Sequence, residues 1–185
     1  MKRIVVGVTG ASGMLYAKRL IEILSRINDI TVHVIISENA KTVSKLENVD
    51  LLGYDVCYEN NDNLSASLAS GSVMFDAMIV IPCSMKTMAT ISNGFSSTLI
   101  SRIADVALKE RRKLIIVPRE SPYSRIHLTN MLTLNDAGAL ILPASPPMYN
   151  NPKTVLDLVD MIVARILDHC DIKYDNLGIG YMWKS

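Results

Sequence analysis

The chain has 185 residues, 49% hydrophobic and 20% charged, which is long enough for one packed domain and too apolar for a disordered chain. Nineteen basic and 18 acidic residues give a formal net charge of +1 without a long basic tract, which argues against a nucleic-acid partner. No apolar run approaches the about 20 residues of a membrane span, and Gly7 breaks the run after Lys2-Arg3, as in a first strand rather than a signal peptide. We therefore expect one cytoplasmic domain over residues 1–185, with no membrane partner.

Short apolar runs alternate with segments of helical periodicity. We predict strands at Ile4–Val8, Thr31–Ile36, Met78–Ile81, Leu114–Val117 and Ala139–Leu142. We predict helices near 16–24, 39–47, 63–70, 85–93, 98–111, 124–135 and 153–169, with a surface loop at 58–63. Strands that alternate with helices favour an α/β fold with a doubly wound, mostly parallel sheet covered on both faces.

The cysteines and hydropathy bear on metals and assembly. Cys57, Cys83 and Cys170 are widely spaced, without a metal-binding pattern such as C-x-x-C, so we predict no metal site and a reducing compartment. Two interpretations of Cys83 are open, a nucleophile or a buried side chain, and His127 is a base, a helix cap or a packing residue. Ten methionines and a mean hydropathy of +0.25 indicate apolar surface buried between subunits.

The most informative site follows the apolar run Leu114–Val117, where Pro118 precedes Arg119 and Glu120. In an open α/β sheet, ligands bind outside the carboxyl ends of the strands. This segment therefore brings a cation and a proton carrier to the edge where such folds perform chemistry. A surface ion pair after a strand is the alternative interpretation of the same residues.

Glycines follow the first predicted strand at Gly7, Gly10 and Gly13. They let the backbone turn tightly and approach a ligand, and the next helix is expected to present free N–H groups to an anion. The spacing is G-x-x-G-x-x-G and differs from the G-x-G-x-x-G pattern of dinucleotide sites. Because Thr9 and Ser12 add hydroxyls that a plain turn does not need, the segment favours a phosphate or cofactor site.

Small polar residues also follow the next two strands. Glu38 suits a ribose hydroxyl of a nicotinamide dinucleotide, whereas Ser37 suits a flavin ribityl or phosphate oxygen, or caps a helix. Ser84, Lys86 and Thr87 open the helix after the third strand, as a second anion site or as an ordinary cap. The same placement after three strands favours one shared ligand.

Further cations and an aromatic residue lie in the second half. Arg102 and Lys109 are seven residues apart, so they share one helix face and could converge with Arg119 on a phosphate. Tyr149 lies in the proline-rich loop after the last strand, and Arg165 lies on the last helix. Taken alone, each residue is better explained by packing or surface exposure.

Taken together, these motifs resemble the UbiX-type flavin prenyltransferases, which belong to a wider flavoprotein group that includes flavin-dependent cysteine decarboxylases. The matching segments keep the family's order over nearly the whole chain: Gly7–Gly13, Ala69–Ser72, Pro82–Thr87, Arg102–Arg112, Val117–Glu120, His127–Met131 and the loop to Tyr149. The resemblance implies a Rossmann-like three-layer αβα sandwich that forms a homo-oligomer, a dodecamer in the family. It also implies binding of FMN and metal-independent transfer of a dimethylallyl group from dimethylallyl phosphate to N5 and C6 of reduced FMN. The prenylated FMN would serve a UbiD-type decarboxylase.

The resemblance carries site residues to this chain position by position. FMN contacts are implied for Gly10, Ala11, Ser12, Ser37, Ser84, Met85, Lys86, Thr87 and Arg119. Tyr149 and Arg165 are implied to hold the prenyl phosphate, while Glu120, Arg102 and Lys109 are implied to be catalytic around it. The chain departs from the family at Ser96–Leu99, where an asparagine is frequent, and Trp183 has no secure counterpart.

Three other functions stay open at this point. An FMN-dependent decarboxylase of cysteine-containing substrates would share the fold, but it would not need cations that clamp a leaving phosphate. A nicotinamide-dependent reductase would need the G-x-G-x-x-G turn that is missing from this sequence. A flavin-binding or storage module would use Arg119 and Glu120 only as a strand cap. The choice between a phosphate and a diphosphate donor, and sharing of the site between subunits, also stay open.

Overall fold

The computed structural model describes residues 1–149, 151–174 and 177–179. Its centre is a six-stranded sheet of order β3-β2-β1-β4-β5-β6 in which every described strand pair is parallel. The strands are β1 (Lys2–Val8), β2 (Ile30–Ile36), β3 (Cys57–Glu59), β4 (Ala77–Cys83), β5 (Lys113–Pro118) and β6 (Leu140–Ile141). The strand order reverses between β1 and β4, so the crevice at their carboxyl ends is where a ligand is expected.

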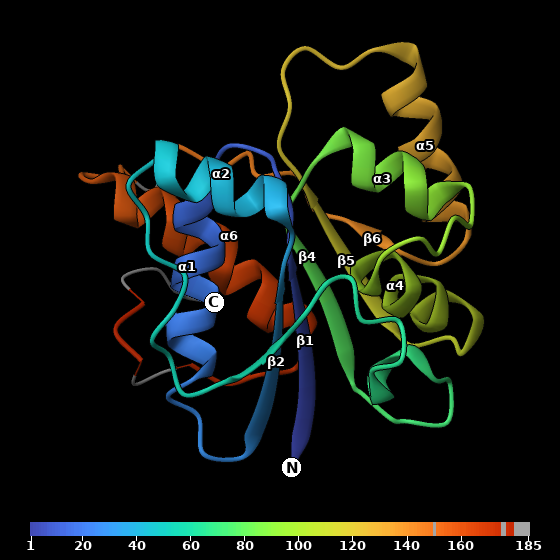
Figure 1. Ribbon diagram of the computed structural model, residues 1–185. Helices are drawn as coiled ribbons and strands as arrows, with labels where there is room; N and C mark the ends of the chain where they lie inside the picture. The colour runs from blue at the N-terminus through green and yellow to red at the C-terminus, as the bar shows by residue number, and fades with distance from the viewer. Residues whose placement is uncertain (150, 175–176, 180–185) are drawn as a thin grey trace.

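Helices cover both faces of the sheet and confirm the predicted three-layer α/β sandwich. They are α1 (Met14–Leu24), α2 (Glu38–Leu46), α3 (Met85–Ser92), α4 (Leu99–Lys109), α5 (Arg125–Asp136) and α6 (Val155–His169). Figure 1 shows α1, α2 and α6 on one side of the sheet and α3, α4 and α5 on the other. Because both faces are covered, every residue of β4 is buried, as are the last five residues of β1 and of β5.

Two of the predicted elements are wrong. The loop predicted at 58–63 begins inside the edge strand β3, which pairs with β2. The helix predicted at 63–70 is instead a series of turns that ends in one 3-10 turn, Ser67–Ala69. The side-chain oxygen of Asn63 accepts the Ser65 N–H at 3.1 Å, and such local bonds compete with a helix.

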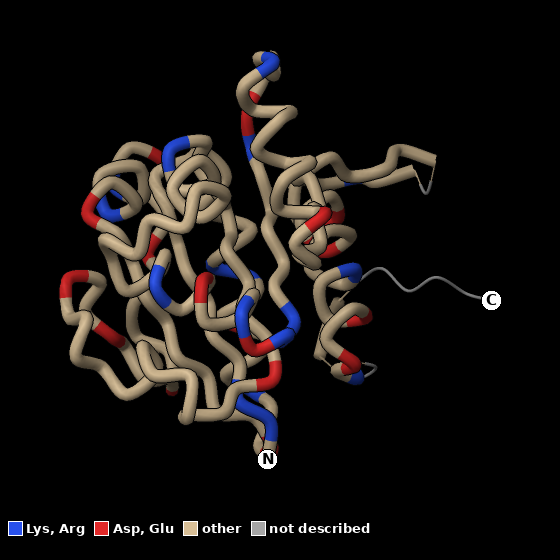
Figure 2. Tube along the Cα trace, turned by 90° about the vertical axis from the view of Figure 1, so that its right-hand side faces the viewer, with Lys and Arg blue, Asp and Glu red and all other residues tan. Residues whose placement is uncertain are grey.

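A buried ion pair fixes α6 against α1. Arg19 Nε donates to Asp160 Oδ1 at 2.7 Å, and Arg19 Nη2 donates to the Gly178 carbonyl at 2.6 Å. Elsewhere, residues of both charge signs are interspersed along the chain (Figure 2). Among the described residues, no helix is both long and apolar enough to cross a membrane.

Candidate functional site

Hydrogen bonds between neighbouring strand ends hold the carboxyl edge of the sheet together. Thr9 Oγ1 donates to the Pro82 carbonyl at 2.7 Å and accepts the Ser84 N–H at 2.8 Å, which joins β1 to β4. The Arg119 N–H donates to the Cys83 carbonyl at 3.4 Å, which extends the connection to β5. The glycine turn after β1, the start of α3 and the segment after β5 are therefore fixed at one edge.

A polar pocket of about 210 Å³ lies at this edge, beside the first turns of α2 and α3. Its lining includes the predicted cofactor residues Gly10, Ser37, Ser84, Lys86 and Thr87. The Ser37 and Ser84 side chains each accept an N–H of the helix that they cap, at 3.2 Å and 3.3 Å. The structure thus brings together residues that follow β1, β2 and β4.

The first turns of α2 and α3 keep donors for a ligand. The amides of Glu38 and Asn39 in α2, and of Met85 and Lys86 in α3, have no acceptor within the described part of the chain. Unpaired amides at helix N-termini attract anions, and a lysine ammonium adds a full positive charge. The pocket therefore suits a phosphate monoester, and FMN carries one.

The first turn of α1 differs, which corrects one prediction. Glu47 Oε1 accepts the Gly13 N–H at 2.8 Å, and Glu47 Oε2 accepts the Met14 N–H at 2.7 Å. The expectation that the helix after the glycine turn presents free N–H groups to an anion is therefore met only in part, because the chain's own carboxylate occupies the Gly13 and Met14 amides. No local pattern in the sequence points to Glu47, which lies 34 residues from Gly13.

The surroundings of Glu47 favour its ionised form. Partial burial opposes ionisation, but hydrogen bonds from Ser12, Gly13 and Met14 and the nearby charge of Arg119 outweigh it, so the pKa of the Glu47 carboxyl lies below its ordinary value. A carboxylate with a lowered pKa in the folded state stabilises the fold above the unfolded-state pKa. That contribution is lost as the pH falls through the folded-state pKa.

We expect Glu47→Gln to lower the free energy of unfolding by about 1–3 kcal/mol near neutral pH, because one of the two amides loses its acceptor. The substitution also removes a titrating group, so the variant should lose less stability than the wild type between about pH 7 and about pH 3. Urea unfolding at both pH values measures the two effects. An equal loss of stability in both proteins over this range would contradict the role of Glu47.

Two hollows of about 370 Å³ each lie next to one another beyond β5. One is lined by Arg119, Glu120 and Ser145, among others, and the second by Tyr149, Arg165 and Ser145, among others. Because Ser145 lines both, the structure brings the Arg119–Glu120 pair close to the two residues predicted to hold the prenyl phosphate. The Glu120 carboxylate is oriented by its Oε1, which accepts the Ser121 N–H at 2.9 Å.

Arg102 and Lys109 lie apart from these hollows. Arg102 Nε donates to the Ala69 carbonyl at 3.1 Å, and its Nη1 pairs with Asp105 Oδ2 at 2.9 Å. Lys109 pairs with Glu110 at the last turn of α4, which runs away from the carboxyl edge toward the start of β5. Within one chain, the predicted convergence of Arg102, Lys109 and Arg119 on a phosphate is not found.

The structure resolves several open interpretations. Cys83 is fully buried, and burial raises the pKa of its thiol, so it is not a nucleophile. His127 Nδ1 accepts a backbone N–H in the capping box of α5, which makes it a helix cap. Glu38 Oε1 pairs with Lys41 Nζ at 2.5 Å on the outside of α2. Trp183 lies outside the described residues.

The remaining predicted cofactor residues do not line the polar pocket but lie next to its lining in sequence or approach the glycine turn. Ala11 is buried and Ser12 is exposed within the glycine turn, and Met85 is the half-buried first residue of α3. The Arg119 side chain also approaches this turn, since its Cγ lies 4.0 Å from the position that a Cβ on Gly13 would occupy. Arg119 thus connects the glycine turn to the hollow that contains Glu120.

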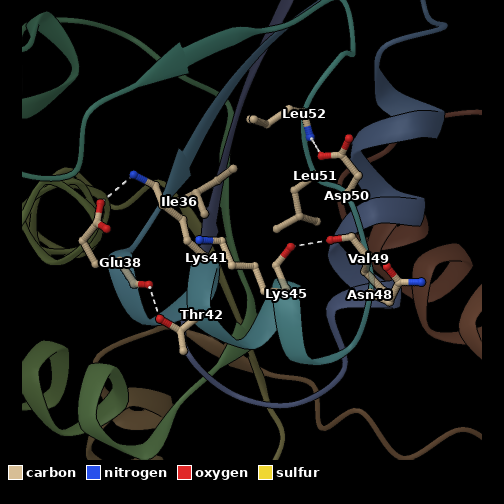
Figure 3. Close-up of a pocket in the computed structure, with 11 residues that line it drawn as sticks. Ile36, Glu38, Lys41, Thr42, Lys45, Asn48, Val49, Asp50, Leu51 and Leu52 are labelled. Carbon is tan, nitrogen blue, oxygen red and sulfur yellow. Dashed lines mark hydrogen bonds and ion pairs between the residues drawn. The ribbon is translucent and has the colours of Figure 1, made fainter.

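A larger pocket, of about 470 Å³, lies elsewhere, between α2 and residues 48–52 (Figure 3). Its wall combines apolar side chains such as Ile36 and Leu51 with Lys41 and Lys45. In the described structure, none of the residues predicted to bind FMN or the prenyl phosphate lines this pocket. The candidate site is therefore identified by its chemistry and its place at the strand ends rather than by size.

Known proteins resemble the chain over most of its length. The profile of the Flavoprotein family matches residues 1–167. The flavin prenyltransferase UbiX of Methanocaldococcus jannaschii is 49% identical over 172 residues, which are 90% of this chain and 91% of that protein. The flavin prenyltransferase LpdB of Lactiplantibacillus plantarum is 49% identical over 173 residues, 91% of this chain and 92% of that protein.

Solved structures of UbiX-type proteins also resemble the chain. The crystal structure of AnUbiX in complex with FMN and dimethylallyl pyrophosphate has a TM-score of 0.91 and 41% identity, covering 100% of this chain and 98% of that chain. A dodecameric FMN-dependent UbiX-like decarboxylase from Escherichia coli O157:H7 has a TM-score of 0.91 and 40% identity, covering 99% of this chain and all of that chain. The peptidyl-cysteine decarboxylase EpiD, at 18% identity and a TM-score of 0.65, shares the fold alone. With this sequence identity and this arrangement of strand-end residues, the chain belongs to the UbiX-type flavin prenyltransferases of the Flavoprotein family.

Proposed function

We propose that this protein transfers the dimethylallyl group of dimethylallyl phosphate to N5 and C6 of reduced FMN, and so supplies prenylated FMN to a UbiD-type decarboxylase. The observation that carries the proposal is the adjacency of two kinds of site at one sheet edge. A pocket rich in hydroxyls and free amides suits the phosphate of FMN, and the hollows around Glu120 and Arg165 suit a second phosphate and a proton carrier.

The described residues fit FMN. Ser37, Ser84, Lys86 and Thr87 surround the pocket with the unpaired amides of α2 and α3, so they are assigned to the cofactor phosphate. Arg119 and the glycine turn are assigned to the ring system, because Glu47 already occupies the amides that begin α1. Reduced FMN supplies the electron-rich positions that accept the prenyl group.

Arg165 and Tyr149 are assigned to the prenyl phosphate. Breaking the C–O bond to phosphate builds negative charge on the leaving oxygens, and an arginine aimed at them stabilises the transition state more than the ground state. Glu120 is assigned to proton transfer. Since its Oε1 accepts the Ser121 N–H, its Oε2 is the atom that can hold the proton.

Assembly belongs to the same proposal. Lys109 lies at the far end of α4, so its catalytic role requires the site of a neighbouring copy rather than the site of its own chain. Arg102, on the same helix, is assigned to such a shared site as well. We therefore include in the proposal a cytoplasmic homo-oligomer, a dodecamer as in the Escherichia coli relative.

An anaerobic assay tests the function. The purified protein is loaded with FMN, reduced and mixed with dimethylallyl phosphate, and the released flavin is weighed by mass spectrometry. We expect a flavin heavier than FMN by one prenyl unit. Unmodified FMN with both the phosphate and the diphosphate donor, while FMN binding is verified separately, would overturn the proposed activity.

A further inference from the structure

Asn61 connects the segment after β3 to the first turn of α4. Its backbone carbonyl accepts the Leu99 N–H at 2.7 Å, and its Oδ1 accepts the Ile100 N–H at 3.2 Å. The next amide in this turn, that of Ser101, donates to Thr98 Oγ1 at 3.3 Å. Unlike α2 and α3, α4 therefore begins with amides that already have partners within the chain.

The bond to α4 determines which atom of the Asn61 amide is free. A backbone N–H requires an acceptor, so the side-chain atom that faces Ile100 is the oxygen, and the Nδ2 group remains as a donor. Asn61 also lines the polar pocket of about 210 Å³ together with Ser84 and Lys86. Within the described residues, the Asn61 Nδ2 group has no acceptor.

The charged residues around this pocket leave a bound phosphate in need of further hydrogen-bond donors. Lys86 is the cation in the lining, which also includes the acidic residues Glu38 and Asp62. The Glu38 carboxylate pairs with Lys41, and ionised carboxylates can only accept hydrogen bonds. A doubly charged phosphate needs donors on several sides, and a neutral amide N–H can supply one beside these carboxylates.

We propose that Asn61 is a further FMN-binding residue, whose Nδ2 donates a hydrogen bond to the cofactor phosphate while its Oδ1 remains on α4. This inference rests on the proposed function, because it takes the pocket beside α2 and α3 as the phosphate site. It assigns a cofactor contact to a residue that follows the edge strand β3, far from the glycine turn in sequence.

Asn61→Asp tests the donor alone. Aspartate keeps an acceptor for the Ile100 N–H, and a carboxylate beside a helix N-terminus preserves stability. It replaces the donor by a negative charge that faces the phosphate. We expect the Kd for FMN, measured by flavin fluorescence, to rise by about 10- to 100-fold. The Kd for riboflavin, which lacks the phosphate, should stay within about twofold of the wild-type value.

Asn63→Asp is the matched control. Asn63 lies in the same segment, and its Oδ1 accepts the Ser65 N–H, but it does not line the pocket. The control introduces the same charge nearby and should bind FMN as the wild type does. If Asn61→Asp does not fold, Asn61→Ala takes its place, and its affinities for FMN and riboflavin are compared in the same way.

Several outcomes would overturn the inference. An FMN affinity of Asn61→Asp equal to that of the wild type would show that Asn61 does not contact the phosphate. An equal loss of FMN and riboflavin affinity would assign Asn61 a structural role only. A similar loss in Asn63→Asp would attribute the effect to charge in general. Failure of the proposed function is distinguishable, because it would appear in the wild-type protein as absent FMN binding or absent prenylation.

Discussion

Glu120→Gln should slow prenyl transfer by about 100- to 10,000-fold and leave FMN bound. Glutamine has the shape of glutamate and keeps an oxygen for the Ser121 N–H, so the segment after β5 should hold its position. It cannot carry the proton that the ring-closing step releases. Anaerobic single-turnover reactions, sampled over time and weighed by mass spectrometry, give the rate of prenylation directly.

A glutamate away from the site provides the control for this prediction. Glu59 lies on the edge strand β3, where its Oε1 pairs with His33 Nδ1 at 3.1 Å, and Glu59→Gln should prenylate FMN at the wild-type rate. A wild-type rate in Glu120→Gln would remove Glu120 from the mechanism. Loss of FMN binding in that variant would instead show that the carboxylate supports the cofactor site.

Arg165→Ala should raise the KM for dimethylallyl phosphate by about 10- to 150-fold, because it removes a charge-assisted hydrogen bond worth about 1.5–3 kcal/mol. The Kd for FMN should change by less than about twofold, since Arg165 lines the hollow with Tyr149 and not the polar pocket beside α3. Arg165 is also exposed on a helix whose neighbouring residues are buried, so its truncation leaves the core intact.

Arg26→Ala is the corresponding control, because Arg26 is an exposed arginine that pairs with Glu22 at the end of α1. It should leave both constants unchanged. Steady-state kinetics with varied donor, together with FMN titration, separates the two effects. A parallel weakening of FMN and of the prenyl phosphate in Arg165→Ala would mean that the residue organises the whole edge rather than one substrate.

The sequence was a good guide where burial alone decides the structure. The strands β1, β4 and β5 are apolar runs covered on both faces, and such runs are visible in the sequence. The edge strand β3 has no such run, because Cys57 and Tyr58 are exposed, and its backbone pairing to β2 makes it a strand. That pairing depends on the folded sheet, so periodicity could not predict it.

The same contrast holds for the site. Ser37, Ser84 and Arg119 were predictable because each follows a strand, and parallel topology brings strand ends to one edge. Glu47 and Asn61 reach that edge through contacts 34 and 39 residues away in sequence, which no local pattern records. Glu47 also argues against the nicotinamide interpretation of Glu38. Two of the amides at the helix start that would hold a pyrophosphate already bind the Glu47 carboxylate.

Ser145 forms a wall common to the hollow of Glu120 and the hollow of Arg165. Reduced FMN and dimethylallyl phosphate bound there would occupy the enzyme at the same time. The dimethylallyl carbon could then be transferred to the flavin directly. The thiol of Cys83 is buried, so it is not available to form a covalent intermediate with the prenyl group. In kinetic terms, this describes a sequential enzyme that works through a ternary complex. Double-reciprocal plots for the two substrates should intersect, and no prenylated protein should accumulate during turnover.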